Sequence, residues 1–292
     1  MLSRQLHARI LLVALGLLLA ACQAGMSTES PTSTPEIRPS ATIPPTALPT
    51  ETETPLPTVV PEEAQKRIAE LMKTNGGCLL PCWWGVTPGK TSMETVNKTL
   101  ARFVSDVSPF PDERHLEGYA ITFGDPETPA REYRILFYTA GEIVEKIDTF
   151  SFDPLAHLLE QYGIPEEVWL HSGGYSMGFQ PPSFSLALLY PEQGVMIYYQ
   201  ERSGGYLSEG GTDYVQICPN DIRNAGNPGL YLWPTGHRLS FAEILPDIYP
   251  KPELVRYEPL EDVSNMDEES FYDAFTNPES SACLKTPADI WP

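Results

Sequence analysis

The sequence is poor in positive charge. Only 19 lysine and arginine residues stand against 39 aspartate and glutamate residues, which gives a net charge of −20. A field of that sign repels phosphate backbones and anionic lipid headgroups, so nucleic acid is excluded as an expected partner, as is a charge-driven membrane contact. We interpret the acidity as a source of solubility, with binding of a cationic ligand or divalent ions as the alternative.

Histidine is scarce, and several common catalytic motifs are missing. The sequence has no His-Glu-x-x-His, Ser-x-x-Lys or Cys-x-x-Cys motif. The acidic stretch from Asp262 to Asp273 lacks the alternating ligands and central glycine of a calcium-binding EF-hand loop. We therefore predict no metal site, no cofactor and no catalytic residue, while a dispersed triad or a carboxylate pair stays open. The histidines stand singly, at His7, His115, His157, His171 and His237.

The N-terminus has the layout of an export signal. Arg4 and Arg9 precede an apolar run from Ile10 to Leu19, which is too short to span a bilayer, and no later apolar run reaches the roughly 18 residues that a membrane helix needs. The ending Leu19-Ala20-Ala21-Cys22 resembles the lipobox of bacterial lipoproteins. The resemblance implies that residues 1–21 are removed and that Cys22 carries fatty acyl chains such as palmitate. The alternative is an ordinary signal followed by an unmodified cysteine.

The predicted location follows from this anchor. Two or three acyl chains on one cysteine hold a soluble domain on a membrane for long periods. We expect the protein on the extracytoplasmic face of the cell membrane, or on the outer membrane if the bacterium has two membranes, because Gln23 is not the usual retention aspartate. Residues 22–60 are rich in serine, threonine and proline, which predicts a disordered or extended linker before a folded domain at residues 61–292.

The most distinctive segment runs from Gly77 to Thr91. Its pattern, Cys-x-x-Pro-Cys-Trp-Trp-Gly-x-x-Pro-Gly-x-Thr, resembles a motif of uncharacterised predicted lipoproteins from bacteria such as the Chloroflexi, a family that supplies no activity. A phosphate-binding loop is excluded because Gly85 and Gly89 enclose three residues rather than four. We predict a Pro-Gly turn that leads into a helix capped by Thr91.

The pattern of the folded part predicts an α+β fold. Two units, at about residues 78–150 and 151–200, each read as a helix followed by an antiparallel meander, packed as one domain. Residues 201–292 are rich in glycine and proline, and we predict one strand added to the sheet and an irregular wrap over it. Thr87 to Thr91 and Tyr162 to Pro165 are weakly similar to the BamE/SmpA outer-membrane lipoproteins, a resemblance that implies protein interaction rather than chemistry.

Four cysteines remain in the predicted domain: Cys78, Cys82, Cys218 and Cys283. An even number in an oxidising compartment predicts disulfides rather than a zinc site. Three pairings are possible. We expect Cys78 to pair with Cys82, because Pro81 bends the chain between them, and Cys218 to pair with Cys283 in the region where packing is thin.

Tryptophan is the remaining candidate for binding. Trp83, Trp84 and Trp233, with Trp169, could form an aromatic platform for sugars or peptidoglycan, and packing in the core is the other interpretation. The sequence therefore predicts a non-catalytic binding or scaffold lipoprotein of the cell envelope, whose partners are envelope proteins or cell-wall glycans. The alternative is an envelope hydrolase that acts on peptidoglycan or polysaccharide.

Overall fold

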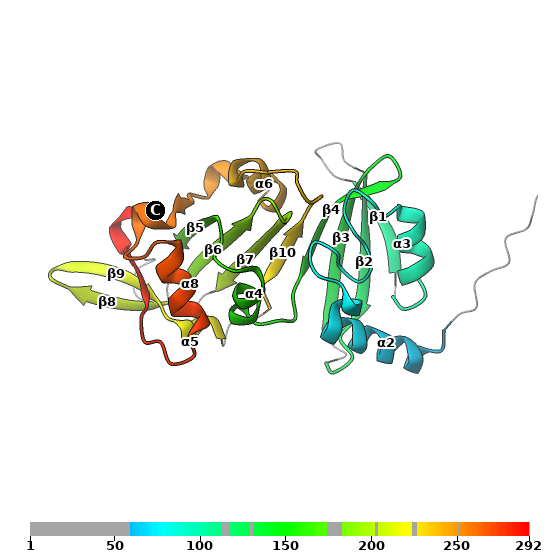
Figure 1. Ribbon diagram of the computed structural model, residues 1–292, viewed down its shortest axis with the longest axis horizontal. Helices are drawn as coiled ribbons and strands as arrows, with labels where there is room; N and C mark the ends of the chain where they lie inside the picture. Colours follow the sequence, from blue (N-terminus) through cyan, green and yellow to red (C-terminus); the bar gives the residue numbers. More distant parts are fainter. Residues whose placement is uncertain are drawn as a thin grey trace, which may run out of the picture. The chain divides into compact units, whose positions relative to one another are not determined.

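The computed structural model describes residues 59–104, 106–111, 117–128, 131–173, 183–201, 204–223, 227–249 and 251–291 (Figure 1). The predicted signal, Cys22 and nearly all of the linker lie outside these residues. Residues Leu56–Pro292 form one unit by their contacts. Within the described residues there are seven α-helices and 12 strands, and all strand pairs are antiparallel. The predicted α+β class with meanders is confirmed.

The first meander follows two helices. Its elements are α2 (Pro61–Thr74), α3 (Met93–Leu100), β1 (Asp106–Pro111), β2 (Glu117–Gly124), β3 (Glu132–Ala140) and β4 (Ile143–Phe150). Alternation in β3 buries Tyr133, Ile135 and Phe137 on one face. The cap of α3 is Ser92, whose hydroxyl accepts from the Thr95 amide, so the prediction of Thr91 was wrong. Thr91 instead accepts from the Thr87 amide and closes the preceding turn.

The second meander repeats the helix-then-strands order. Its elements are α4 (Leu155–Tyr162), β5 (Glu167–Gly173), β6 (Ser183–Tyr190) and β7 (Val195–Glu201). Gly194, in the turn between β6 and β7, has a φ of +74°, and a Cβ there would lie 2.2 Å from the Trp233 carbonyl oxygen. Only glycine fits a turn with that backbone angle and that close neighbour.

A strand from the C-terminal part joins the two meanders. In the nine-stranded sheet the order is β1-β2-β3-β4-β10-β7-β6-β5-β11, so β10 (Gly229–Leu232) lies between β4 and β7 (Figure 1). The strand of the C-terminal part that joins the large sheet is therefore a central one. At the far edge, β11 (Glu258–Pro259) pairs with β5.

The rest of the predicted wrap holds more regular structure than its composition indicates. A second sheet has the order β12-β9-β8, and this part of the chain also contains four helices. The bounds are β8 (Gly205–Glu209), β9 (Thr212–Ile217), α5 (Pro219–Arg223), α6 (Phe241–Ile248), α7 (Leu260–Val263), α8 (Glu268–Thr276) and β12 (Leu284–Pro287). These elements are short, which is why glycine and proline are dense between them.

The large sheet is covered on both faces. Along β10, Leu230 and Leu232 belong to the core cluster that also contains buried residues of α3, α4 and α8. The intervening Tyr231 belongs to a second cluster with Phe241 and Ile244 of α6. Because neighbouring strand residues point to opposite faces, α6 covers the face opposite α3 and α4.

Candidate functional site

The cysteine and tryptophan motif forms a closed loop after α2, and Asn75 holds it. Asn75 ends α2 in the left-handed conformation, with a φ of 49°. Its side-chain nitrogen donates to the carbonyl oxygens of Cys78 (3.0 Å) and Cys82 (2.9 Å), and its side-chain oxygen accepts from the Trp84 amide (2.9 Å). One side chain thus fixes both cysteines and a tryptophan. Sequence reasoning missed it, although an asparagine before Gly-Gly is a typical helix end.

The disulfide and a tight turn complete the loop. Cys78 and Cys82 are bonded, as the sequence predicts. Trp83 and Val86 exchange backbone hydrogen bonds of 2.8 and 2.9 Å, with Trp84 (φ 52°) and Gly85 (φ 85°) between them. Positive φ at both central residues is typical of a type I′ turn. Glycine adopts such an angle readily, whereas a positive φ at a bulky residue such as Trp84 is uncommon.

The predicted tryptophan platform is not open to solvent. Trp83, Trp84 and Trp233 are 2%, 3% and 0% exposed. Trp83 stacks on Trp84, whose ring lies 5.0 Å from that of Phe123. Trp233 lies in the cluster under α6 and donates to the His237 carbonyl oxygen. The structure does not bring these tryptophans together at one surface, and their burial favours the packing interpretation.

A cavity of about 320 Å³ lies between this loop and α4. Its volume is at the lower end of the range typical of small-molecule sites. Residues of the motif, of α2, of α4, of β4 and of β10 surround it, so it opens where the two meanders meet. The apolar lining consists of Leu71, Met72, Leu79, Leu80, Trp83, Trp84, Phe150, Phe152, Leu158 and Leu230.

Polar side chains from the α4 segment also line the cavity. The His157 Nδ1 atom lies 2.9 Å from Asp153 Oδ1, and both side chains are about half exposed. The Tyr162 hydroxyl accepts from the Leu80 amide at 3.1 Å, which joins the disulfide loop to α4. Burial raises the pKa of Tyr162 above its ordinary value, so this hydroxyl stays protonated at neutral pH. The site combines apolar walls with polar groups that can orient a ligand.

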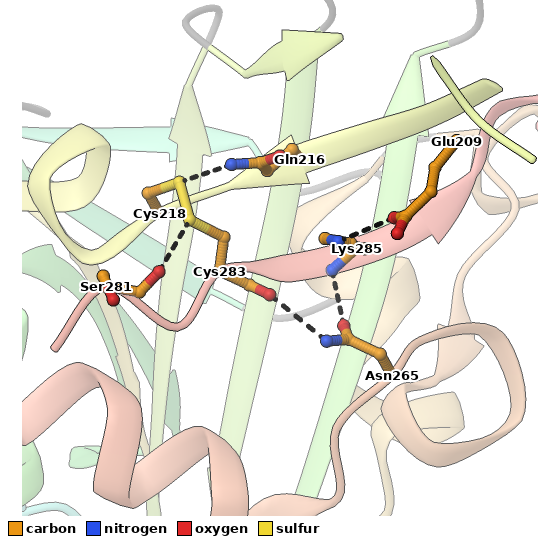
Figure 2. Close-up of polar contacts among 7 residues, drawn as sticks. All are labelled: Glu209, Gln216, Cys218, Asn265, Ser281, Cys283 and Lys285. Carbon is orange, nitrogen blue, oxygen red and sulfur yellow. Dashed lines mark hydrogen bonds and ion pairs between the residues drawn. A yellow bond between two sulfur atoms is a disulfide. The ribbon is translucent and has the colours of Figure 1, made fainter. Parts of the chain in front are cut away.

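The second predicted disulfide lies in the small sheet. Cys218 follows β9 and Cys283 precedes β12, so the bond continues the strand pair Ile217 and Leu284 (Figure 2). Beside it, Asn265 accepts from the Lys285 amide at 2.6 Å and donates to the Cys283 carbonyl oxygen at 3.3 Å (Figure 2). These bonds close the outer edge of β12.

Two features of the described residues bear on other functions. They contain no group of three or more histidine, cysteine, aspartate or glutamate residues placed to hold a metal ion. None of the helices in the described part of the chain is long and apolar enough to cross a membrane. His7 and His115 lie outside the described residues.

Comparison with known proteins gives no relative: no family model, no curated protein and no solved structure matches the chain. The resemblances found in the motif and in the signal therefore stay predictions.

Proposed function

We propose that this chain is a lipid-anchored, extracytoplasmic binding module of the cell envelope. Residues 1–21 have the order of charged, apolar and small residues that export requires, and Cys22 follows them directly. Two disulfides in the folded part fit an oxidising compartment, where paired thiols persist. The proline-rich linker then spaces the domain from the membrane surface.

The observation that carries the binding role is the cavity beside the disulfide loop. Its apolar walls and polar α4 side chains suit a small molecule with an apolar or aromatic body and one polar end. The hydroxyl and sulfur groups that line it make structural contacts. Thr74 donates to the Glu70 carbonyl oxygen, Ser151 accepts from the Asp153 amide, Tyr162 accepts from the Leu80 amide, and Cys78 is in a disulfide. This supports binding without chemistry.

The anchor is tested by replacing Cys22 with serine. We expect Cys22→Ser to lose labelling by radioactive palmitate and to move from the membrane fraction to the soluble fraction, because the acyl chains supply the membrane affinity. Gln23→Ser is the matched control and should stay on the membrane. Unchanged fractionation of Cys22→Ser would contradict the anchor.

The cavity is tested by closing it without touching the core. His157 is half exposed, so His157→Trp should cover the opening, whereas Glu160→Trp places the same ring on an exposed part of α4 that does not line the cavity. Native mass spectrometry of protein purified from membranes should show a bound small molecule in the wild type and in Glu160→Trp, and none in His157→Trp. A wild type without ligand, or equal loading of all three, would contradict this site.

A hydrolase is the second candidate, and one contact favours it. A carboxylate 2.9 Å from an imidazole nitrogen is the arrangement that orients a general base, as Asp153 and His157 are placed here. The test is the release of reducing ends from peptidoglycan or polysaccharide. Release by the wild type that is abolished in His157→Ala would show that the chain is an enzyme rather than a binding module.

A further inference from the structure

A second hollow lies on the α6 face of the large sheet. It has a volume of about 380 Å³ and is formed over β3, β4, β10 and β7. Leu136 and Tyr198, which line it, pack against the core cluster under α6. The cavity beside the disulfide loop is lined by other residues, except that Phe150 lines both. We refer to this hollow as the polar cleft.

The aromatic ring of Tyr198 forms the floor of the polar cleft. It occupies the space that a side chain at Gly229 would fill. Tyr198 on β7 is paired with Gly229 on β10, and a Cβ at Gly229 would lie 2.1 Å from the tyrosine ring. The ring therefore lies across β10, and its hydroxyl donates to Asp148 Oδ1 on β4 at 3.0 Å. Burial and the nearby Asp148 carboxylate raise the pKa of Tyr198 well above its ordinary value, so the hydroxyl remains a donor.

Four residues with planar polar side chains line the cleft together with this ring: Arg134, Asp148, Gln200 and Asn227. Gln200 also donates to the Tyr249 hydroxyl, which ties the cleft wall to the chain after α6. The set contains both donors and acceptors, and its one positive and one negative charge balance. A bare anion would meet the Asp148 carboxylate, and a bare cation would meet Arg134.

A sugar ring has the chemistry that matches this arrangement. Its C–H face packs on an aromatic ring, and its neighbouring hydroxyls both donate and accept, which planar amide, carboxylate and guanidinium groups can satisfy in pairs. An apolar ligand would displace water from the amides of Gln200 and Asn227 without replacing its hydrogen bonds, at a cost in free energy. We propose that the polar cleft is a binding site for a neutral saccharide. This inference stands on the cleft alone and does not rest on the membrane anchor or on the cavity beside the disulfide loop.

Isothermal titration of the purified chain with tetrasaccharides of β-1,4-linked N-acetylglucosamine and of β-1,4-linked glucose tests the proposal. We expect saturable binding of at least one of them. Gln200 and Asn227 are exposed, so Gln200→Ala and Asn227→Ala remove hydrogen-bonding groups without opening the core. Each should weaken binding by up to about tenfold, the equivalent of one lost hydrogen bond.

The controls separate this site from the rest of the molecule. Gln193→Ala and Asn97→Ala replace exposed residues of the same types outside the cleft and should bind like the wild type, as should His157→Trp. Melting curves check that every variant is folded. The proposal is overturned if neither tetrasaccharide binds at about 10 mM, where even a weak millimolar complex is well populated. It is equally overturned if the Gln200→Ala, Asn227→Ala double variant binds as tightly as the wild type.

Discussion

At the scale of single residues, Gly229 joins the two meanders. Its missing side chain lets the Tyr198 ring cross β10 and reach Asp148 on β4. We expect Gly229→Ala to lower the free energy of unfolding by about 1 to 3 kcal/mol, because the added methyl group overlaps the ring and forces Tyr198 away from its hydrogen bond. Urea denaturation measures the change.

A double-mutant cycle identifies the cause. In the Tyr198→Ala background the added methyl group meets no ring, so Gly229→Ala should cost much less there than in the wild type. An equal loss of unfolding free energy in both backgrounds would mean that the backbone at Gly229, rather than the Tyr198 ring, causes the effect. Gly229 does not have a positive φ, so alanine is not excluded there by backbone strain. The steric explanation is therefore the one under test.

Residues whose roles are local were predictable, and residues whose roles depend on distant partners were not. Both disulfide pairs followed from the spacing of four cysteines and the bend at Pro81. Gly229 acts through Tyr198 and Asp148, which lie 31 and 81 positions away in the chain. A single sequence does not show such neighbours, so the polar cleft was not foreseen.

At the scale of elements, the strongly patterned segments were predicted and the irregular ones were not. The helices α3 and α4 and the strands β2 to β7, which make up the two predicted units, show clear periodicity. The missed strand β1 contains Pro109 and Pro111, and β12 ends at Pro287. Proline argues against a central strand, and both of these strands lie at the edge of a sheet, where proline is tolerated. The central place of β10 depends on pairing over long distances and had no local signal.

The disulfide loop gives a prediction at this scale. Asn75→Gly keeps the left-handed backbone but loses three side-chain hydrogen bonds, and should lower the free energy of unfolding by about 2 to 3 kcal/mol. Asn75→Ala should cost about 1 kcal/mol more, because a Cβ residue is strained at that φ. Denaturation curves of the two variants separate the side-chain bonds from the backbone conformation. Equal stability of Asn75→Gly and the wild type would show that the disulfide holds the loop alone.

At the scale of the whole molecule, the C-terminal part has two different relations to the rest. Its strand β10 is paired on both sides, with β4 and with β7, in the middle of the large sheet. Its strands β8, β9 and β12 form a separate small sheet, in which β9 and β12 are joined by the Cys218–Cys283 disulfide. The C-terminal third should therefore not unfold as one cooperative unit, which a uniform wrap would do.

Removing each disulfide by paired serine substitutions tests this division. Loss of Cys218–Cys283, with a sequence separation of 65, should lower the free energy of unfolding by about 4 kcal/mol in the chain-entropy model, and loss of the short Cys78–Cys82 loop by about 2 kcal/mol. In the first variant, hydrogen exchange should accelerate at the amides of β8, β9 and β12 and stay slow in β10, because β4 and β7 still hold that strand. If the β10 amides accelerate together with those of the small sheet, the disulfide supports the central sheet as well, and the two parts unfold as one unit.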